Sequence, residues 1–190
     1  MNGSQLFGVL YGSQFKFDKE KMPVEIDALR EKLMKEYEEG EKPERKKRIL
    51  LTGCPSSGAP MKVVKAIEEH GGNVVVYENC GGAKSVDRLI DEDAEDIYKA
   101  IAERYLAIGC SVMTPDNNRI ELMGRLLEEY NIEGVVEMTL QACHTYNIEA
   151  KSIEKFVKSK GLPYIHVETD YSQADIGQLD TRIAAFLEMI

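Results

Sequence analysis

Short apolar runs alternate with helical patterns along most of this chain, and this alternation limits the folds open to it. From residue 47 onward, each apolar or β-branched run ends in glycine or polar residues, and stretches with helical spacing of apolar side chains follow. The strand-like runs cover residues 48–53, 73–78, 134–140 and 163–169. The helical patterns cover residues 61–70, 91–108, 117–130, 148–160 and 175–189. Strands that alternate with helices predict an α/β domain with a parallel central sheet.

Helices that connect parallel strands through right-handed crossovers cover both faces of the sheet. We therefore predict a Rossmann-like (flavodoxin-like) three-layer domain over residues 47–190, with a parallel sheet of about four strands. Residues 1–46 have a different pattern, in which a short apolar opening precedes a charged amphipathic helix at about residues 22–39. We expect this segment to be an N-terminal helical extension whose apolar stripe packs on another surface.

The charge balance excludes some classes of partner. The formal net charge is −9, and residues 45–48 form the one dense cluster of lysine and arginine, so we expect no nucleic acid partner. No apolar run approaches the roughly 18 residues that span a bilayer, and the start of the chain does not resemble a secretory signal. We expect a cytoplasmic protein with no membrane partner.

Three of the four cysteines follow strands directly. Cys54 comes after the first predicted strand, Cys80 after the second and Cys143 after the third. Because the carboxyl ends of parallel strands meet at one edge of a sheet, these three thiols should lie at the same edge. Cys110 follows a helix instead, so its loop must return to that edge for it to join them.

The residues alone leave the role of the cysteines open between core packing, reactive thiols and metal ligands. Glycine and polar loop residues surround them, and following helices point their N-termini at the same crevice, which favours metal binding. Successive cysteines are 26, 30 and 33 residues apart, so neither the paired spacing of zinc sites nor the spacing of ferredoxins is present. Spacing therefore does not choose between zinc and an iron–sulfur cluster.

Polar residues beside the cysteines are further candidates. His144 and Tyr146 are equally suited to donating protons near a bound group or to capping the loop that follows Cys143. Glu168 ends the last predicted strand, where it either lines the site or helps to begin the final helix.

Several loops together resemble a known family. These are GCPSSGAPMKVVKAIEEHGG, VVVYENCGGAKS, GCSVMTPDNNR, QACHTYNIE and VETDYSQADIGQLDTRIAAFLEM. From about residue 47 to residue 190 they resemble the 2-hydroxyacyl-CoA dehydratase / benzoyl-CoA reductase family, and most closely its double-cubane-cluster branch of anaerobic ATP-dependent reductases. The resemblance implies two Rossmann-like halves with a cluster between them.

The resemblance also implies a cofactor and partners. The cofactor would be an iron–sulfur cluster, either [4Fe-4S] or a double-cubane [8Fe-9S], and a separate ATP-hydrolysing activator with its own [4Fe-4S] cluster would deliver low-potential electrons. The substrate would be an acyl-CoA or another small molecule. Cys143 matches a ligand position of the second half, Cys80 and Cys110 match additional cysteines of the double-cubane branch, and Cys54 has the least defined role.

The resemblance covers only the second half of the family's subunit, so we expect a partner to complete the site. That partner would be the N-terminal half or a second subunit, in a homo- or hetero-oligomer such as a dimer, and the isolated chain would hold no complete cluster. Three hypotheses follow: a cluster-bearing module of a reductase or dehydratase (lyase), a non-catalytic half-subunit or scaffold, and a flavodoxin-like or thiol-redox protein without metal. The third is the least favoured, because no C-x-x-C motif or flavin-phosphate loop is visible.

Overall fold

A parallel four-stranded sheet forms the centre of the described structure. The computed structural model describes residues 1–40, 42–54 and 58–190. The strands are β1 (Lys47–Gly53), β2 (Gly72–Glu78), β3 (Gly134–Leu140) and β4 (Tyr164–Thr169). They lie in the order β2-β1-β3-β4, and every neighbouring pair is parallel. The predicted parallel α/β sheet is confirmed.

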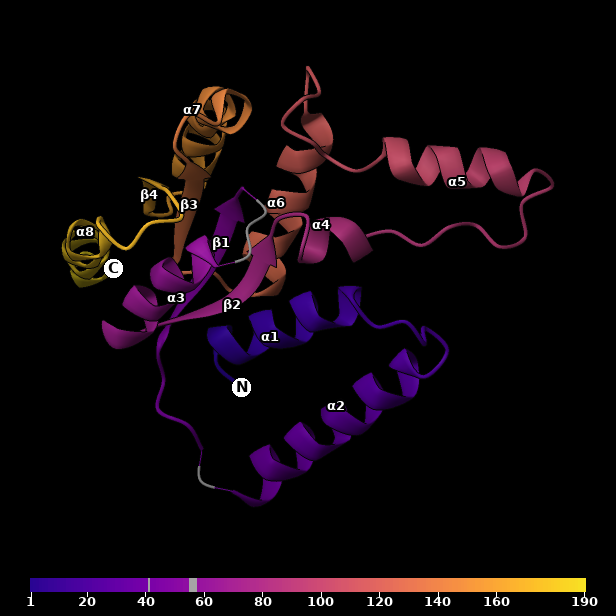
Figure 1. Cartoon of the computed structure of the whole chain (residues 1–190), viewed down its shortest axis with the longest axis horizontal. Helices are drawn as coiled ribbons and strands as arrows, with labels where there is room; N and C mark the ends of the chain where they lie inside the picture. Colours follow the sequence, from indigo (N-terminus) through magenta and orange to yellow (C-terminus); the bar gives the residue numbers. More distant parts are fainter. Residues whose placement is uncertain (41, 55–57) are drawn as a thin grey trace.

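Helices cover both faces of this sheet (Figure 1). α3 (Ala59–Glu69) and α8 (Ile176–Glu188) pack on one face, and α6 (Asn117–Glu129) and α7 (His144–Ser159) on the other. The strands supply both cores because successive side chains point to opposite faces. Ile49 and Leu51 of β1 join the α3–α8 core, whereas Leu50 between them joins the α6–α7 core. The three-layer Rossmann-like arrangement is thus confirmed.

The N-terminal segment contains a helix that the sequence pattern did not predict. The apolar opening forms α1 (Gly3–Gln14), which packs against β2 and α3. The Gly3 N–H donates to the Asn73 side chain over 2.8 Å, and the Tyr77 hydroxyl donates to the Gly3 carbonyl over 2.8 Å. A Cβ on Gly3 would lie 2.7 Å from the Cβ of Val74, so glycine allows this close approach.

The predicted charged helix forms where expected but buries nothing. α2 (Met22–Glu39) has no buried residue, and Val24 and Met34 are 70% and 54% exposed. Figure 1 shows it standing apart from the sheet. Its apolar stripe therefore has no packing surface within the described residues.

A second projecting segment lies between β2 and α6. The spacing of apolar residues predicts one helix over residues 91–108, but only α5 (Ile97–Leu106) is helical, with Asp96 as its N-cap. The short α4 (Ala83–Val86) precedes it. We call residues 87–109 the arm, because Figure 1 shows α5 extending away from the sheet. No helix in the described part of the chain is long and apolar enough to cross a membrane.

Candidate functional site

Two cysteines meet at the carboxyl edge of the sheet, and Leu140 joins them. The Leu140 N–H donates to the Cys54 Sγ over 3.3 Å, and the Leu140 carbonyl accepts from the Cys143 N–H over 3.0 Å. The two thiols also hydrogen-bond to one another. The predicted closeness of the first and third strand-end cysteines is therefore present. Residues 55–57, which continue the Cys54 loop, lie outside the described part of the chain.

Cys54 and Cys143 have opposite environments. Cys54 is 2% exposed, and burial raises the pKa of its thiol to about 12. Cys143 is partly exposed and is the N-cap of α7. Burial acts to raise the pKa of Cys143, but hydrogen bonds from the Tyr146 N–H, the Thr145 hydroxyl and Cys54 outweigh it and lower that pKa. The accessible thiol is thus the more acidic of the two.

The helix after Cys143 begins earlier than its sequence pattern indicates. The pattern predicts a start at Ile148, but α7 begins at His144. The turn before it is tight, since Ala142 has a φ of 62°. This places His144 and Tyr146 in the first turn of the helix, where His144 is exposed and Tyr146 is buried.

The two remaining cysteines lie on neighbouring loops. Cys80 is exposed in the loop between β2 and α4, close enough to Tyr146 to act on its hydroxyl electrostatically. The loop of Cys110 does return to the edge, because the Ser111 hydroxyl donates to Thr145 over 3.3 Å. Even so, no group of three His, Cys, Asp or Glu side chains among the described residues is placed to hold a metal ion.

A buried charge network that sequence reasoning missed lies beneath these loops. Arg119 of α6 is fully buried and contacts Glu78 at the end of β2, Glu137 in β3 and Glu149 in α7. Its guanidinium also donates to the Thr52 hydroxyl in β1 over 2.8 Å. The available signal was a glutamate inside each of two apolar strands, VVVYE and GVVEMTL, since a carboxylate there needs a buried cation.

We call this set the Arg119 network, and its charges control one another. It comprises Thr52, Glu78, Lys84, Arg119, Glu137, Tyr146, Glu149 and Tyr164. Burial disfavours the charged guanidinium, but the carboxylates of Glu78, Glu137 and Glu149 outweigh it and raise the pKa of Arg119. Burial likewise raises the pKa of Glu137, against the opposing effect of Arg119.

The Arg119 network connects the segments that carry the cysteines. Thr52 lies two residues before Cys54, and Glu78 two residues before Cys80. Gly109, next to Cys110, packs on Arg119 so closely that a Cβ there would lie 2.6 Å from the Arg119 nitrogen. Arg119 therefore fixes these three loop origins relative to α7, which begins directly after Cys143.

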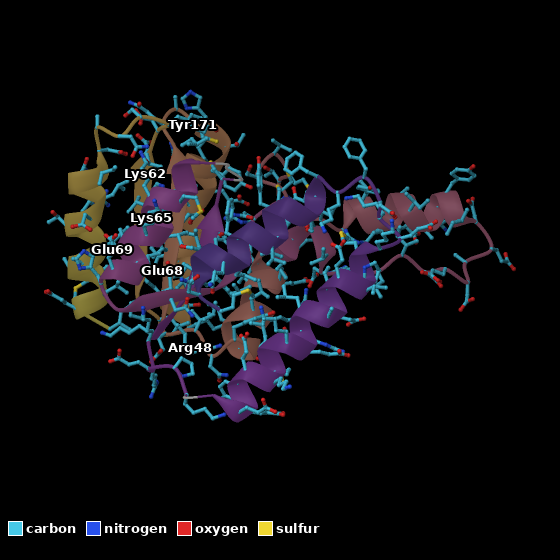
Figure 2. All side chains as sticks on the ribbon, turned by 60° about the horizontal axis from the view of Figure 1, so that its bottom comes forward. Arg48, Lys62, Lys65, Glu68, Glu69 and Tyr171 are labelled. Carbon is cyan, nitrogen blue, oxygen red and sulfur yellow. The ribbon has the colours of Figure 1, made fainter. Side chains whose placement is uncertain are left out.

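The end of β4 adds a polar wall at the same edge. Glu168 is exposed and accepts from the Asn147 side chain over 2.9 Å, which ties β4 to α7. Asp175 accepts from Lys62 of α3 over 2.5 Å. Figure 2 shows Lys62 at the same end of the molecule as Tyr171, with Arg48 at the opposite end.

Comparison with known proteins identifies the family. A family described as 2-hydroxyglutaryl-CoA dehydratase, D-component, matches residues 1–190. The chain belongs to this family. The match confirms the resemblance that the cysteine loops indicated.

Three curated relatives of this dehydratase family match the chain. A protein of Escherichia coli K12 provisionally named dehydratase subunit YjiM is 48% identical over 191 residues, which are 100% of this chain and 50% of that protein. One of the benzoyl-CoA reductase subunits of Thauera aromatica is 23% identical, over 80% of this chain and 36% of its own. The beta chain of the (R)-2-hydroxyglutaryl-CoA dehydratase of Acidaminococcus fermentans is 25% identical, over 52% and 27% respectively. The chain thus spans half the length of the first relative and matches smaller shares of the other two.

The cysteines fit the cluster of the dehydratase resemblance in part. Cys54 and Cys143 offer two adjacent sulfurs, and backbone N–H groups already donate to both. Such donors stabilise thiolate ligands of a cluster. The described residues nevertheless bring no third ligand into the same group. They form one side of a cluster site.

Proposed function

We propose that this chain is the iron–sulfur-cluster-binding module of a 2-hydroxyacyl-CoA dehydratase-like or double-cubane ATP-dependent reductase. It would accept low-potential electrons from an ATP-hydrolysing activator. The observation that supports this best is the contact between Cys54 and Cys143 at the carboxyl edge of a parallel sheet, in a chain of the dehydratase family. A bound cluster would supply one-electron transfer.

The residues would have distinct tasks. Cys143 is the first ligand candidate, because its thiol is the acidic and accessible one. Cys54, Cys80 and Cys110 are the other candidates. His144 and Glu168 are exposed at the same edge and are suited to contact a substrate, whereas buried Tyr146 is suited to hold the cysteine loops in place.

The proposal extends to organisation and partners. Residues 1–46 would form an extension and residues 47–190 the cluster-binding domain. The partners would be the activator and a second half or subunit, and the substrate an acyl-CoA or a similar small molecule. We place the reaction in an anaerobic cytoplasm. The relatives named as subunits support the idea of an oligomer, either homo- or hetero-oligomeric.

Anaerobic analysis of iron and acid-labile sulfide tests this function. After reconstitution, the wild-type chain should be brown and contain both, and Cys143→Ser should lose most of the iron. Ser152→Ala, an exposed change in α7, serves as the matched control and should keep it. Colourless protein with stoichiometric zinc, or equal iron in wild type and Cys143→Ser, would contradict the proposal.

A second candidate function is a non-catalytic half-subunit that completes a metal site only with a partner chain. It is favoured by the lack of a third metal-ligating side chain beside Cys54 and Cys143 in the described regions. Light scattering of the reconstituted chain separates the two candidates. A monomer that holds a full cluster would exclude the second.

A further inference from the structure

Cys54 and Cys143 are arranged as a reactive pair of thiols. They approach from different segments, one directly after β1 and the other at the start of α7. Opposite polar groups of Leu140 hold them, its N–H at the Cys54 Sγ and its carbonyl at the Cys143 N–H. Since the thiols already hydrogen-bond to one another, a change of the Cys143 side-chain torsion is sufficient to bring the sulfurs to bonding distance.

The two thiols also differ in access, as attacking and resolving thiols do. Cys143 is partly exposed at the N-terminus of a 16-residue helix, where the first-turn N–H groups and the helix dipole favour the thiolate. Cys54 is 2% exposed and lies directly behind it in the core. An external oxidant therefore reaches Cys143 first and finds Cys54 as the nearest second thiol.

We propose that Cys143 and Cys54 form a reversible intramolecular disulfide, which makes this pair a redox modification site of the metal-free chain. The oxidant is a small-molecule disulfide, such as oxidised glutathione. The Cys143 thiolate attacks one of its sulfurs, forms a mixed disulfide and releases one equivalent of the small thiol. Cys54 then loses its proton and attacks the Cys143 sulfur, which releases the second equivalent. Two protein thiols are oxidised, and one small disulfide is reduced to two thiols.

The disulfide goes beyond the proposed function because it uses the same two sulfurs in another way. The oxidised chain has neither sulfur available as a metal ligand, and a dithiol reductant restores both. The site would thus record whether the chain was exposed to an oxidant before it acquired a metal.

Peptide mapping tests the proposal directly. Trypsin places each cysteine in a separate peptide, namely residues 49–62, 66–84, 105–119 and 126–151. The reduced, metal-free full chain is treated with oxidised glutathione under argon, quenched with acid and digested. The expected product is one linkage between peptides 49–62 and 126–151, which dithiothreitol removes. A linkage of peptide 126–151 to 66–84 or 105–119 would overturn the proposal, as would four separate glutathione adducts.

Three serine variants test the order of the steps. Cys54→Ser should stop at a stable glutathione adduct on Cys143, because the resolving thiol is gone. Cys143→Ser should slow the reaction of Cys54 at least tenfold, because only the buried thiol remains. Cys80→Ser is the control and should still form the linkage at the wild-type rate. Circular dichroism of each variant confirms folding, and a Cys54 that reacts at the wild-type rate in folded Cys143→Ser would contradict the sequence of steps.

The same samples separate this proposal from the cluster proposal. If the linkage forms but the reduced chain takes up no iron and sulfide, the disulfide stands and the cluster function fails. If the reduced chain binds iron but no linkage appears in the metal-free form, the disulfide fails and the cluster function stands.

Discussion

Arg119 is a charged residue with no access to water, which is costly unless its charge is matched. Moving an isolated ion into a protein interior costs several kcal/mol, and only close opposite charges and hydrogen bonds offset it. Arg119 has both, since Glu78 and Glu137 are fully buried beside it and Thr52 accepts a hydrogen bond. Removing the cation would therefore leave two carboxylates buried without their counter-charge.

Substitution of this arginine should be strongly destabilising. We expect Arg119→Leu to lower the free energy of unfolding by about 3–5 kcal/mol. Arg125 lies on the same helix and pairs with Asp87, but its side chain is 53% exposed. Arg125→Leu should cost no more than about 1 kcal/mol. Urea unfolding measures both, and equal losses would show that the buried network adds no stability.

Asp116 should give the chain an unusual pH dependence. Burial, followed by a hydrogen bond with Glu149, raises the pKa of Asp116 to about 6. The folded state then binds a proton that the unfolded state, with an aspartate pKa of about 3.9, releases earlier. The contribution of this group to stability is therefore present below about pH 4 and is lost as pH rises through about 6.

The Asp116→Asn variant isolates this effect. An amide oxygen can still accept the hydrogen bond that Arg119 N–H donates to Asp116, so the helix cap is kept. The variant should match wild type in urea unfolding at pH 4 and become progressively more stable than wild type up to pH 7. A difference that is constant with pH would contradict the raised pKa.

At this scale the sequence identifies the cysteines but not the network. Their positions after strands place Cys54 and Cys143 at one edge, because strand ends in a parallel sheet are fixed by topology. The pairing of Glu78 and Glu137 with Arg119 depends on side chains far apart in sequence that meet only after the sheet and α6 pack. A charged residue in an apolar strand indicates a buried partner without revealing which one.

Among the elements, α1 packs on the sheet through a glycine. Gly3 faces Val74 closely, with 2.9 Å between a Cβ on Gly3 and the Val74 carbonyl oxygen, whereas a Cβ on Gly8 would meet nothing within 4 Å. We expect Gly3→Ala to destabilise the chain by about 1–3 kcal/mol through overpacking. Gly8→Ala should stabilise α1 by about 0.5–1 kcal/mol through helix propensity. Urea unfolding with near-ultraviolet circular dichroism compares them, and a neutral Gly3→Ala would argue against tight docking.

The boundaries of elements were predictable where packing follows local pattern. All four strands and the helix at residues 22–39 lie where periodicity places them. α1 was missed because its sequence, GSQLFGVLYGSQ, contains glycines that lower helix propensity, and tertiary contacts compensate for them. The start of α7 was missed because Cys143 caps it without any side-chain hydrogen bond that marks a usual N-cap.

For the whole molecule, the arm is the part that should open first. Figure 1 shows α5 away from the sheet, whereas α7 packs into the core through Ile153 and Val157. Lys99 on α5 and Lys151 on α7 are similarly exposed, at 73% and 84% of their side chains. Brief trypsin treatment should cleave after Lys99 at least tenfold faster than after Lys151, because cleavage needs local unfolding. Mass spectrometry of the fragments measures both rates, with Lys99→Gln as the control.

The sheet order also has a consequence for how the chain is made. β1 lies between β2 and β3, so β1 and β2 emerge from the ribosome early and pair while the other edge of β1 waits for residues 134–140. Arg119 emerges in the same interval, before Glu137 and Glu149 exist to surround it. A nascent chain that stops near residue 130 thus has an open strand edge and an unmatched internal charge, which are the features that chaperones guard. Productive folding is a late event in synthesis, and a pause before residue 149 is the time at which this protein is most exposed to aggregation.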